Sequence, residues 1–282
     1  MEEARNQNRD SGKAGIVNWL NAYDEKRDAA GLVMPNLDYE SQLIAILQLL
    51  GHQRRAEKEI NAEIDRLKSL AERSGNEHTI DLWCEHVNQS AYQAAAHSMA
   101  AVGMIAPFVE STFCQAFRGI EHAMTKAVPP LFGHERWQRP AEDQWDCRYV
   151  WKHGRRSRDL VRGVTQLADA IGLLPYLPDG MEPTLSALFE YRNKMFHFGF
   201  EWPVEERRHF DDKLRKRQWP TDWFSRSTVG EDPWVFYMSS KFIDHCLATA
   251  GGIITGIGHF CDQRLYSMED GSLAIKLEGV RS

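Results

Sequence analysis

The stretch from Tyr39 to Arg73, YESQLIAILQLLGHQRRAEKEINAEIDRLKSLAER, decides the fold class of this 282-residue chain. Its apolar residues recur three and four positions apart, which is typical of a helix that buries one face. A heptad counted from Leu43 has apolar residues at all but two of its core positions, Gln53 and Glu57. We therefore expect a long helix, with Gly51 as the place where an interruption would fall. It would pack within the chain as one arm of a hairpin; the alternative is a seam between two copies.

The residues that follow this helix continue the helical pattern. Ser74 to Asn76 predicts a turn, and a second helical stretch runs from about Thr79 to Val128. Pro107 is expected to kink or divide it, because proline lacks the N–H of the helical ladder. Pro129 and Pro130 would end it.

Three further helices are expected toward the C-terminus. They cover Arg155–Ile171, stopped by Gly172, a segment that starts near Glu182, and a stretch from about Ser239 to Tyr266. Trp234–Met238 is the one short strand expected. Helices dominate this reading, so the sequence predicts an all-α fold, a helical bundle with a long N-terminal helix.

The expected organisation has three parts. Residues 1–36 form an N-terminal segment that is mostly disordered or short-helical, with a polar lead to about residue 14 and a short helix through Ile16, Trp19 and Leu20. Residues 37–78 form the long helix, and residues 79–282 form the main helical domain. Within that domain, the Trp- and Pro-rich segment 202–234 is expected to be a loop insertion at the surface.

Charge and cysteine content restrict the class of protein. The net charge of −6 means that any nucleic-acid binding must come from a local basic patch. The five cysteines are an odd number and are widely spaced, which favours reduced thiols in a cytoplasmic protein. The polar start predicts no signal peptide. The apolar run Ala248–Cys261 is too short and too rich in glycine to span a bilayer, so no membrane partner is expected.

The sharpest chemical signal is the Arg-Asn-x-x-x-His pattern of Arg192, Asn193 and His197, which lies in PTLSALFEYRNKMFHFGFEWP, residues 183–203. Asn193 and His197 are four apart and share a helix face, whereas Arg192 and His197 would point about 140° apart on an ideal helix. To meet, they need a long reach by Arg192, a distortion or end of the helix near Phe198–Gly199, or a partner chain.

The pattern resembles the R-x(4–6)-H motif of the HEPN superfamily, in which a polar residue such as Asn193 often follows the arginine. The resemblance implies a helical bundle over roughly residues 80–266 and a homodimer with the motif helices facing each other. It also implies a metal-independent endoribonuclease without a cofactor, acting as a toxin or phage-defence effector. RNA would be the substrate, and an antitoxin-like or regulatory protein a further partner.

The residue types suit this chemistry. Histidine exchanges a proton near neutral pH, so by the resemblance His197 would be the general acid or base. Arginine stays charged and binds two phosphate oxygens at once, so Arg192 would hold the phosphate. Asn193 would orient His197 or the phosphate. In the competing interpretation, Arg192 pairs with Glu190 or Glu201, His197 caps the helix end, and the chain is an inactive HEPN-like helical dimer that binds proteins or nucleotides.

Other clusters contain residue types that could bind RNA, a metal ion or another helix. Two basic segments could hold RNA or form solvated faces: Arg148, Lys152, His153, Arg155, Arg156, Arg158 and Arg162; and Arg207, Arg208, Lys213, Arg215, Lys216 and Arg217 with Trp219 and Trp223. His245-Cys246 and His259-x-Cys261 are wrongly spaced for one zinc site and are read as core residues. The small residues Ala248, Gly252 and Gly256 would let another helix approach closely.

Overall fold

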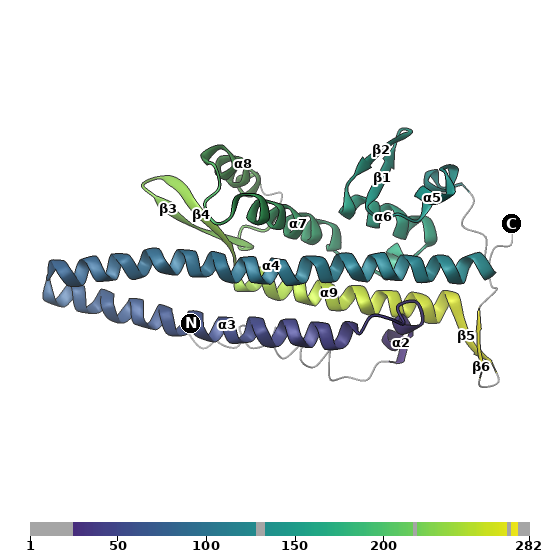
Figure 1. The fold of residues 1–282 in the computed structure, drawn as a ribbon, viewed down its shortest axis with the longest axis horizontal. Coiled ribbons are helices and arrows are strands. Elements are labelled where there is room, and N and C mark those ends of the chain that lie inside the picture. Colours follow the sequence, from purple (N-terminus) through teal and green to yellow (C-terminus); the bar gives the residue numbers. More distant parts are fainter. Residues whose placement is uncertain (1–24, 128–132, 217–218, 270–271, 276–282) are drawn as a thin grey trace. The chain divides into compact units, whose positions relative to one another are not determined.

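The computed structural model describes residues 25–127, 133–216, 219–269 and 272–275. Helices dominate these residues and the strands are short, so the all-α character is confirmed (Figure 1). The predicted lead to residue 14, the helix through Ile16, Trp19 and Leu20, and the breaks at Val128–Pro130 lie outside the described residues.

The chain forms two compact units, which are described separately. Unit 1 comprises Met1–Gln42, Pro107–Ser186 and Leu247–Ser282, and unit 2 comprises Leu43–Ala106 and Ala187–Cys246. The expected division at residues 36 and 78 stays a prediction.

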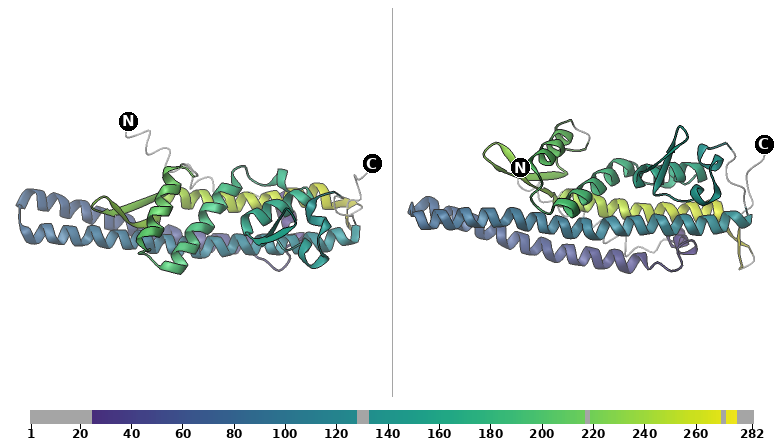
Figure 2. Two further views of the ribbon diagram at one scale, coloured as in Figure 1. Left: turned by 90° about the horizontal axis from the view of Figure 1, so that it is seen from above. Right: turned by 45° about the horizontal axis from the view of Figure 1, so that its top comes forward.

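Unit 2 contains a helical hairpin. It is formed by α3 (Tyr39–Ser74) from Leu43 onward and by α4 (Glu77–Ala127) as far as Ala106, which are joined through Gly75 and Asn76 and run side by side (Figures 1 and 2). The heptad positions of α3 are buried or half-buried, and Glu57, one of its polar exceptions, pairs with buried His97 of α4 at 3.4 Å. The hydrogen bond from His97 holds the pKa of Glu57 below its usual value. The internal hairpin is therefore confirmed, and Gly51 does not interrupt α3.

Pro107 lies inside α4 and does not divide it. Among the described helices, Glu77–Met124 is long and apolar enough to cross a membrane by length and composition, with 56% of its most apolar window buried inside the protein. A core helix of a soluble protein passes the same test.

An aromatic core holds the rest of unit 2 together. The helix α8 (Val204–Arg215) lies beside a hairpin of β3 (Phe224–Val229) and β4 (Asp232–Met238), which pair antiparallel from Phe224–Met238 to Val229–Asp232 (Figure 2). Trp202 stacks on Phe236 with ring centroids 5.4 Å apart, and Phe210 meets Trp202 edge-on at 5.1 Å. The expected surface loop over 202–234 is thus wrong, because its large rings are buried; the expected strand Trp234–Met238 is confirmed.

Unit 1 contains a second hairpin where a helix was expected. The strands β1 (Tyr149–Lys152) and β2 (Arg155–Arg158) pair antiparallel, and α6 (Leu160–Ile171) begins only after them. His153 (φ 51°) and Gly154 (φ 78°) both have the positive φ that a two-residue hairpin turn needs. The predicted helix start at Arg155 is wrong for this reason, whereas the stop at Gly172, with φ 76°, is confirmed.

Buried Arg136 organises this part of unit 1. It lies in η2 (Glu135–Gln138), followed by the short helix α5 (Ala141–Gln144). Its guanidinium, which has no exposed surface, donates to the carbonyls of Gln144, Asp146 and Tyr149 and to Oε1 of Gln166. Burial lowers the pKa of Arg136 to about 10, so the group is still charged at neutral pH.

The remaining elements of unit 1 gather at the C-terminal half of α9 (Ser240–Phe260). They are the helices α2 (Glu25–Asp28) and η1 (Ala29–Leu32), the turn η3 (Leu174–Tyr176), the π-helical turn η4 (Cys261–Leu265), and the strands β5 (Tyr266–Glu269) and β6 (Ser272–Ile275). A Cβ on Gly256 would lie 2.3 Å from the carbonyl oxygen of Tyr176. The close neighbour of this glycine is thus the backbone of the short helical turn η3.

Candidate functional site

The Arg-Asn-x-x-x-His pattern lies on α7 (Met181–Phe198), in the part of that helix that belongs to unit 2. Leu188, Tyr191 and Met195 are buried, as their spacing predicts. The hydroxyl of Tyr191 donates to the carbonyl of Phe236 at 3.0 Å, and burial raises the pKa of Tyr191 far above its usual value. A neutral tyrosine bonded to β4 therefore fixes the rotation of α7 about its axis.

The opposite face of α7 carries the motif. Arg192 is half-buried, and Asn193, Phe196 and His197 are exposed. At about 100° per residue, these four side chains leave the helix in the order 192, 196, 193, 197 across an arc of roughly 140°. The motif therefore occupies a continuous solvent-facing strip, with Phe196 and Asn193 between the arginine and the histidine.

The guanidinium of Arg192 turns toward this strip. Its Nη1 lies 3.4 Å from Oδ1 of Asn193, and its Cζ lies 5.9 Å from the ring centroid of Phe196. No ion pair to Arg192 occurs within the residues that the structure describes. The charge of this arginine is consequently available to an external anion.

The glutamates that could have neutralised Arg192 have other partners. Glu190 pairs with Lys213 of α8, and Glu201 accepts a hydrogen bond from the hydroxyl of Tyr92 on α4. Lys194, the other cation of the motif segment, pairs with Glu206, and this bond lowers the pKa of Glu206. The internal ion pair of the competing interpretation is therefore not formed.

His197 lies in the last turn of α7. Its ring centroid is 6.3 Å from that of Phe198, and no hydrogen bond or ion pair to its imidazole is found in the described part of the chain. The helix stays α-helical to Phe198 and ends at Gly199, which has φ 70° and donates its N–H to the carbonyl of Met195 at 3.0 Å. The helix ends where expected but does not distort between Arg192 and His197, so a reaching arginine or a second chain remains to join them.

Phe196 is a site residue that sequence reasoning missed. Its ring is 56% exposed, yet its Cζ lies 3.4 Å from where a Cβ on Gly103 of α4 would stand. The ring thus packs on α4 at Gly103, where that helix has no side chain. Its position four residues after Arg192 was the available signal, since i and i+4 share a helix face. An exposed aromatic beside a free cation can stack a nucleic-acid base.

The basic segment of unit 1 is partly neutralised. Arg148, Arg156 and Arg162 pair with aspartates. The cations left exposed and without an ion pair to any described residue are Lys152, Arg155 and Arg158. They lie on the β1–β2 hairpin, which therefore presents a local positive charge.

The basic segment of unit 2 is mostly paired. Lys213 pairs with Glu190, and Arg215 and Arg226 both pair with the buried carboxylate of Asp211. Trp219 and Trp223 are buried and so are core residues rather than stacking platforms. Arg217 lies outside the described residues.

Of the His–Cys pairs of α9 and η4, the thiols are core groups as expected, whereas His245 is exposed and His259 is half-buried, which corrects the expectation for the two histidines. Cys246 and Cys261 are buried, which raises the pKa of each thiol, and His245 packs on the ring of Trp223. A search of the described residues finds no group of three or more His, Cys, Asp or Glu side chains placed to hold a metal ion.

Comparisons with known proteins add no relative. No protein-family model matches the chain, and neither the curated proteins nor the solved structures give a significant match. The likeness to HEPN proteins therefore rests on the motif itself and on the helical architecture.

Proposed function

We propose that the chain is a metal-independent endoribonuclease of HEPN type, working as a homodimer in a toxin or phage-defence setting. One observation carries the proposal: Arg192, with no anionic partner among the described residues, shares the solvent-facing strip of α7 with Asn193 and His197. Both nearby glutamates are bonded elsewhere, so neither neutralises this charge.

The proposed reaction uses the 2′-hydroxyl of RNA as the nucleophile. His197 transfers the proton, and Arg192 holds the phosphate oxygens while negative charge grows on them. Asn193, already 3.4 Å from Arg192, orients the guanidinium, and Phe196 offers a ring on which a neighbouring base can stack. The products are a 2′,3′-cyclic phosphate and a 5′-hydroxyl.

Dimerisation would complete the site. Arg192 and His197 leave α7 about 140° apart, so one phosphate is poorly placed to meet both from the same chain. In a twofold dimer with facing α7 helices, Arg192 of one protomer and His197 of the other can contact the same phosphate. The exposed ring of Phe196 would supply apolar contact at such an interface.

The test is cleavage of single-stranded RNA of mixed sequence by the purified chain in EDTA. We expect His197→Ala and Arg192→Ala to lose about 100-fold or more of the rate, the usual worth of a proton-transfer or charge-stabilising group. His209→Ala is the matched control, because His209 is an exposed histidine of α8 in the same unit. A DNA oligonucleotide of the same sequence, which lacks the 2′-hydroxyl, should stay intact. Equal rates for wild type and His197→Ala would end the catalytic proposal.

A second function is favoured by a different observation. The α3–α4 hairpin of unit 2 exposes large apolar side chains at Ile44, Leu49, Leu70, Ile80 and Val87. Such side chains suit a catalytically inactive helical dimer that binds a protein partner. A dimer by light scattering that cleaves none of the RNAs, with Arg192→Ala indistinguishable from wild type, would support this module over the ribonuclease.

A further inference from the structure

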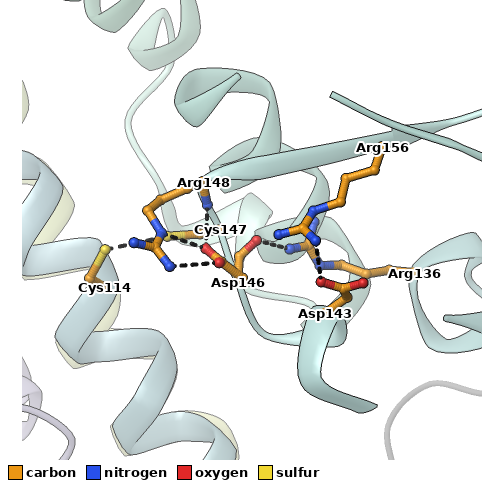
Figure 3. A network of polar contacts seen from close by, with 7 residues as sticks. All are labelled: Cys114, Arg136, Asp143, Asp146, Cys147, Arg148 and Arg156. Carbon is orange, nitrogen blue, oxygen red and sulfur yellow. Dashed lines mark hydrogen bonds and ion pairs between the residues drawn. The ribbon is translucent and has the colours of Figure 1, made fainter. Parts of the chain in front are cut away.

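Two cysteines far apart in the sequence meet in unit 1. Cys114 lies on α4, and Cys147 lies between α5 and β1; their Sγ atoms are 3.7 Å apart (Figure 3). A disulfide bond needs about 2.05 Å between the sulfurs, so the two sulfurs must come about 1.6 Å closer for one to form. Both cysteines are reduced in the structure.

The backbone around Cys147 is held firmly. The guanidinium of Arg136 binds the carbonyl of Asp146 (Figure 3) and the carbonyl of Tyr149, which lie on either side of Cys147. On α6, Gly163 packs so tightly that a Cβ there would lie 2.2 Å from the carbonyl oxygen of Cys147. Cys147 is 2% exposed, whereas Cys114 is only half-buried. A small oxidant can thus reach Cys114, whereas Cys147 is buried and its backbone is fixed.

The surroundings of the two thiols shift their pKa values in opposite directions. The hydrogen bond from Cys147 lowers the pKa of Cys114 to about 7, helped by Arg148 and Arg118 and opposed by burial and by Glu110. The same hydrogen bond, together with burial, raises the pKa of Cys147. Asp146 binds Arg148 through both of its carboxylate oxygens and keeps that arginine beside the sulfurs (Figure 3).

We propose that Cys114 and Cys147 form a peroxide-sensitive dithiol, with Cys114 as the attacking thiolate and Cys147 as the resolving thiol. The Cys114 thiolate attacks a hydroperoxide ROOH, the O–O bond breaks, and ROH leaves with a proton, so that Cys114 becomes a sulfenic acid. Cys147 then attacks the Cys114 sulfur, its proton joins the leaving hydroxide, and water is released as the disulfide forms. Two thiols lose two electrons and one peroxide gains them.

The other cysteines provide internal comparisons. Cys84 is exposed on α4 but has no second thiol beside it in the described residues, so accessibility alone would make it the first to react. Cys246 and Cys261 are buried with raised pKa values and should stay reduced. Under the proposal Cys114 reacts before the more exposed Cys84, because the thiolate and not the thiol is the nucleophile. It does not depend on ribonuclease activity.

The experiment treats the reduced full-length chain with a small excess of hydrogen peroxide at pH 7, blocks the remaining thiols with N-ethylmaleimide and identifies the products by mass spectrometry. Trypsin with a glutamate-specific protease separates Cys84 from Cys114 and gives peptides 111–118 and 143–148 for the pair. We expect these two peptides linked and two hydrogens lighter, reversed by dithiothreitol, with Cys84 still blocked by maleimide. Iodoacetamide alkylation of Cys114 should reach half its maximal rate near pH 7, about tenfold above an ordinary thiol at that pH.

Three variants separate the roles. Cys147→Ser removes the resolving thiol, so peroxide should leave a sulfenic acid on Cys114 that dimedone traps. Cys114→Ser should leave Cys147 unreacted, and Cys84→Ser should form the linked peptides as wild type does. Faster oxidation of Cys84 than of Cys114, or persistence of Cys114 sulfenic acid in the wild type, would overturn the proposal.

Discussion

At the scale of single residues, the clearest structural role belongs to Arg136. Its buried guanidinium joins η2 to the segment that leads into β1 and to α6 through four hydrogen bonds. It supports a loop-rich region, because its four bonds tie carbonyl and amide oxygens from separate segments to one buried group.

Arg136→Met should therefore destabilise the protein by more than about 3 kcal/mol, since four hydrogen bonds of one buried charged group are lost together. Urea unfolding followed by circular dichroism measures this change. Arg155→Met, on the exposed β1–β2 hairpin, is the matched control and should stay within about 0.5 kcal/mol of wild type. Equal midpoints for the two variants would contradict the anchoring role.

The residues of the candidate site differ in how far sequence could identify them. Arg192, Asn193 and His197 are candidates because of the resemblance to a known motif, whereas helical spacing alone predicts the buried stripe of Leu188 and Tyr191. The partners of the neighbouring glutamates could not be foreseen. Lys213 and Tyr92 are 23 and 109 residues away from their respective glutamates, and only tertiary packing brings them together.

At the scale of elements, periodicity located the long helices and composition misled elsewhere. The expected helix Tyr39–Arg73 is observed as Tyr39–Ser74 because its heptad is long and regular. The β1–β2 hairpin was missed because Arg155–Arg158 has no alternation of apolar and polar residues. The turn His153–Gly154 was the only local signal. In the Trp-rich segment 202–234, the prolines suggested a loop, whereas the segment forms α8 and the β3–β4 hairpin and buries most of its large rings.

Two helical glycines give opposite expectations. Gly256→Ala in α9 would place a Cβ 2.3 Å from the Tyr176 carbonyl oxygen, an overlap that costs about 1–3 kcal/mol because backbone must move. Gly51→Ala in α3 has no atom within 4 Å and should gain up to about 1 kcal/mol from helix propensity. Thermal unfolding of both variants checks the pair. A Gly256→Ala variant as stable as wild type would show that η3 does not press on α9.

At the scale of the whole molecule, the proposed ribonuclease makes a prediction about mixed subunits. If each site takes Arg192 from one protomer and His197 from the other, a dimer of one Arg192→Ala and one His197→Ala chain has one complete site. Random mixing of the two inactive variants should then restore about a quarter of the wild-type rate, because half the dimers are mixed and each has one of two sites. The measurement is RNA cleavage after unfolding and refolding the variants together. If each chain instead held a complete site, mixing would restore nothing.

The charge left open on α7 has one more consequence. Because the nearby glutamates are already bonded, Arg192 has no carboxylate among the described residues to displace before it takes up a ligand. An acidic loop of another protein could therefore occupy the same guanidinium as a phosphate would. Under the proposed function, an inhibitor protein would place a carboxylate where the RNA phosphate binds and so exclude the RNA.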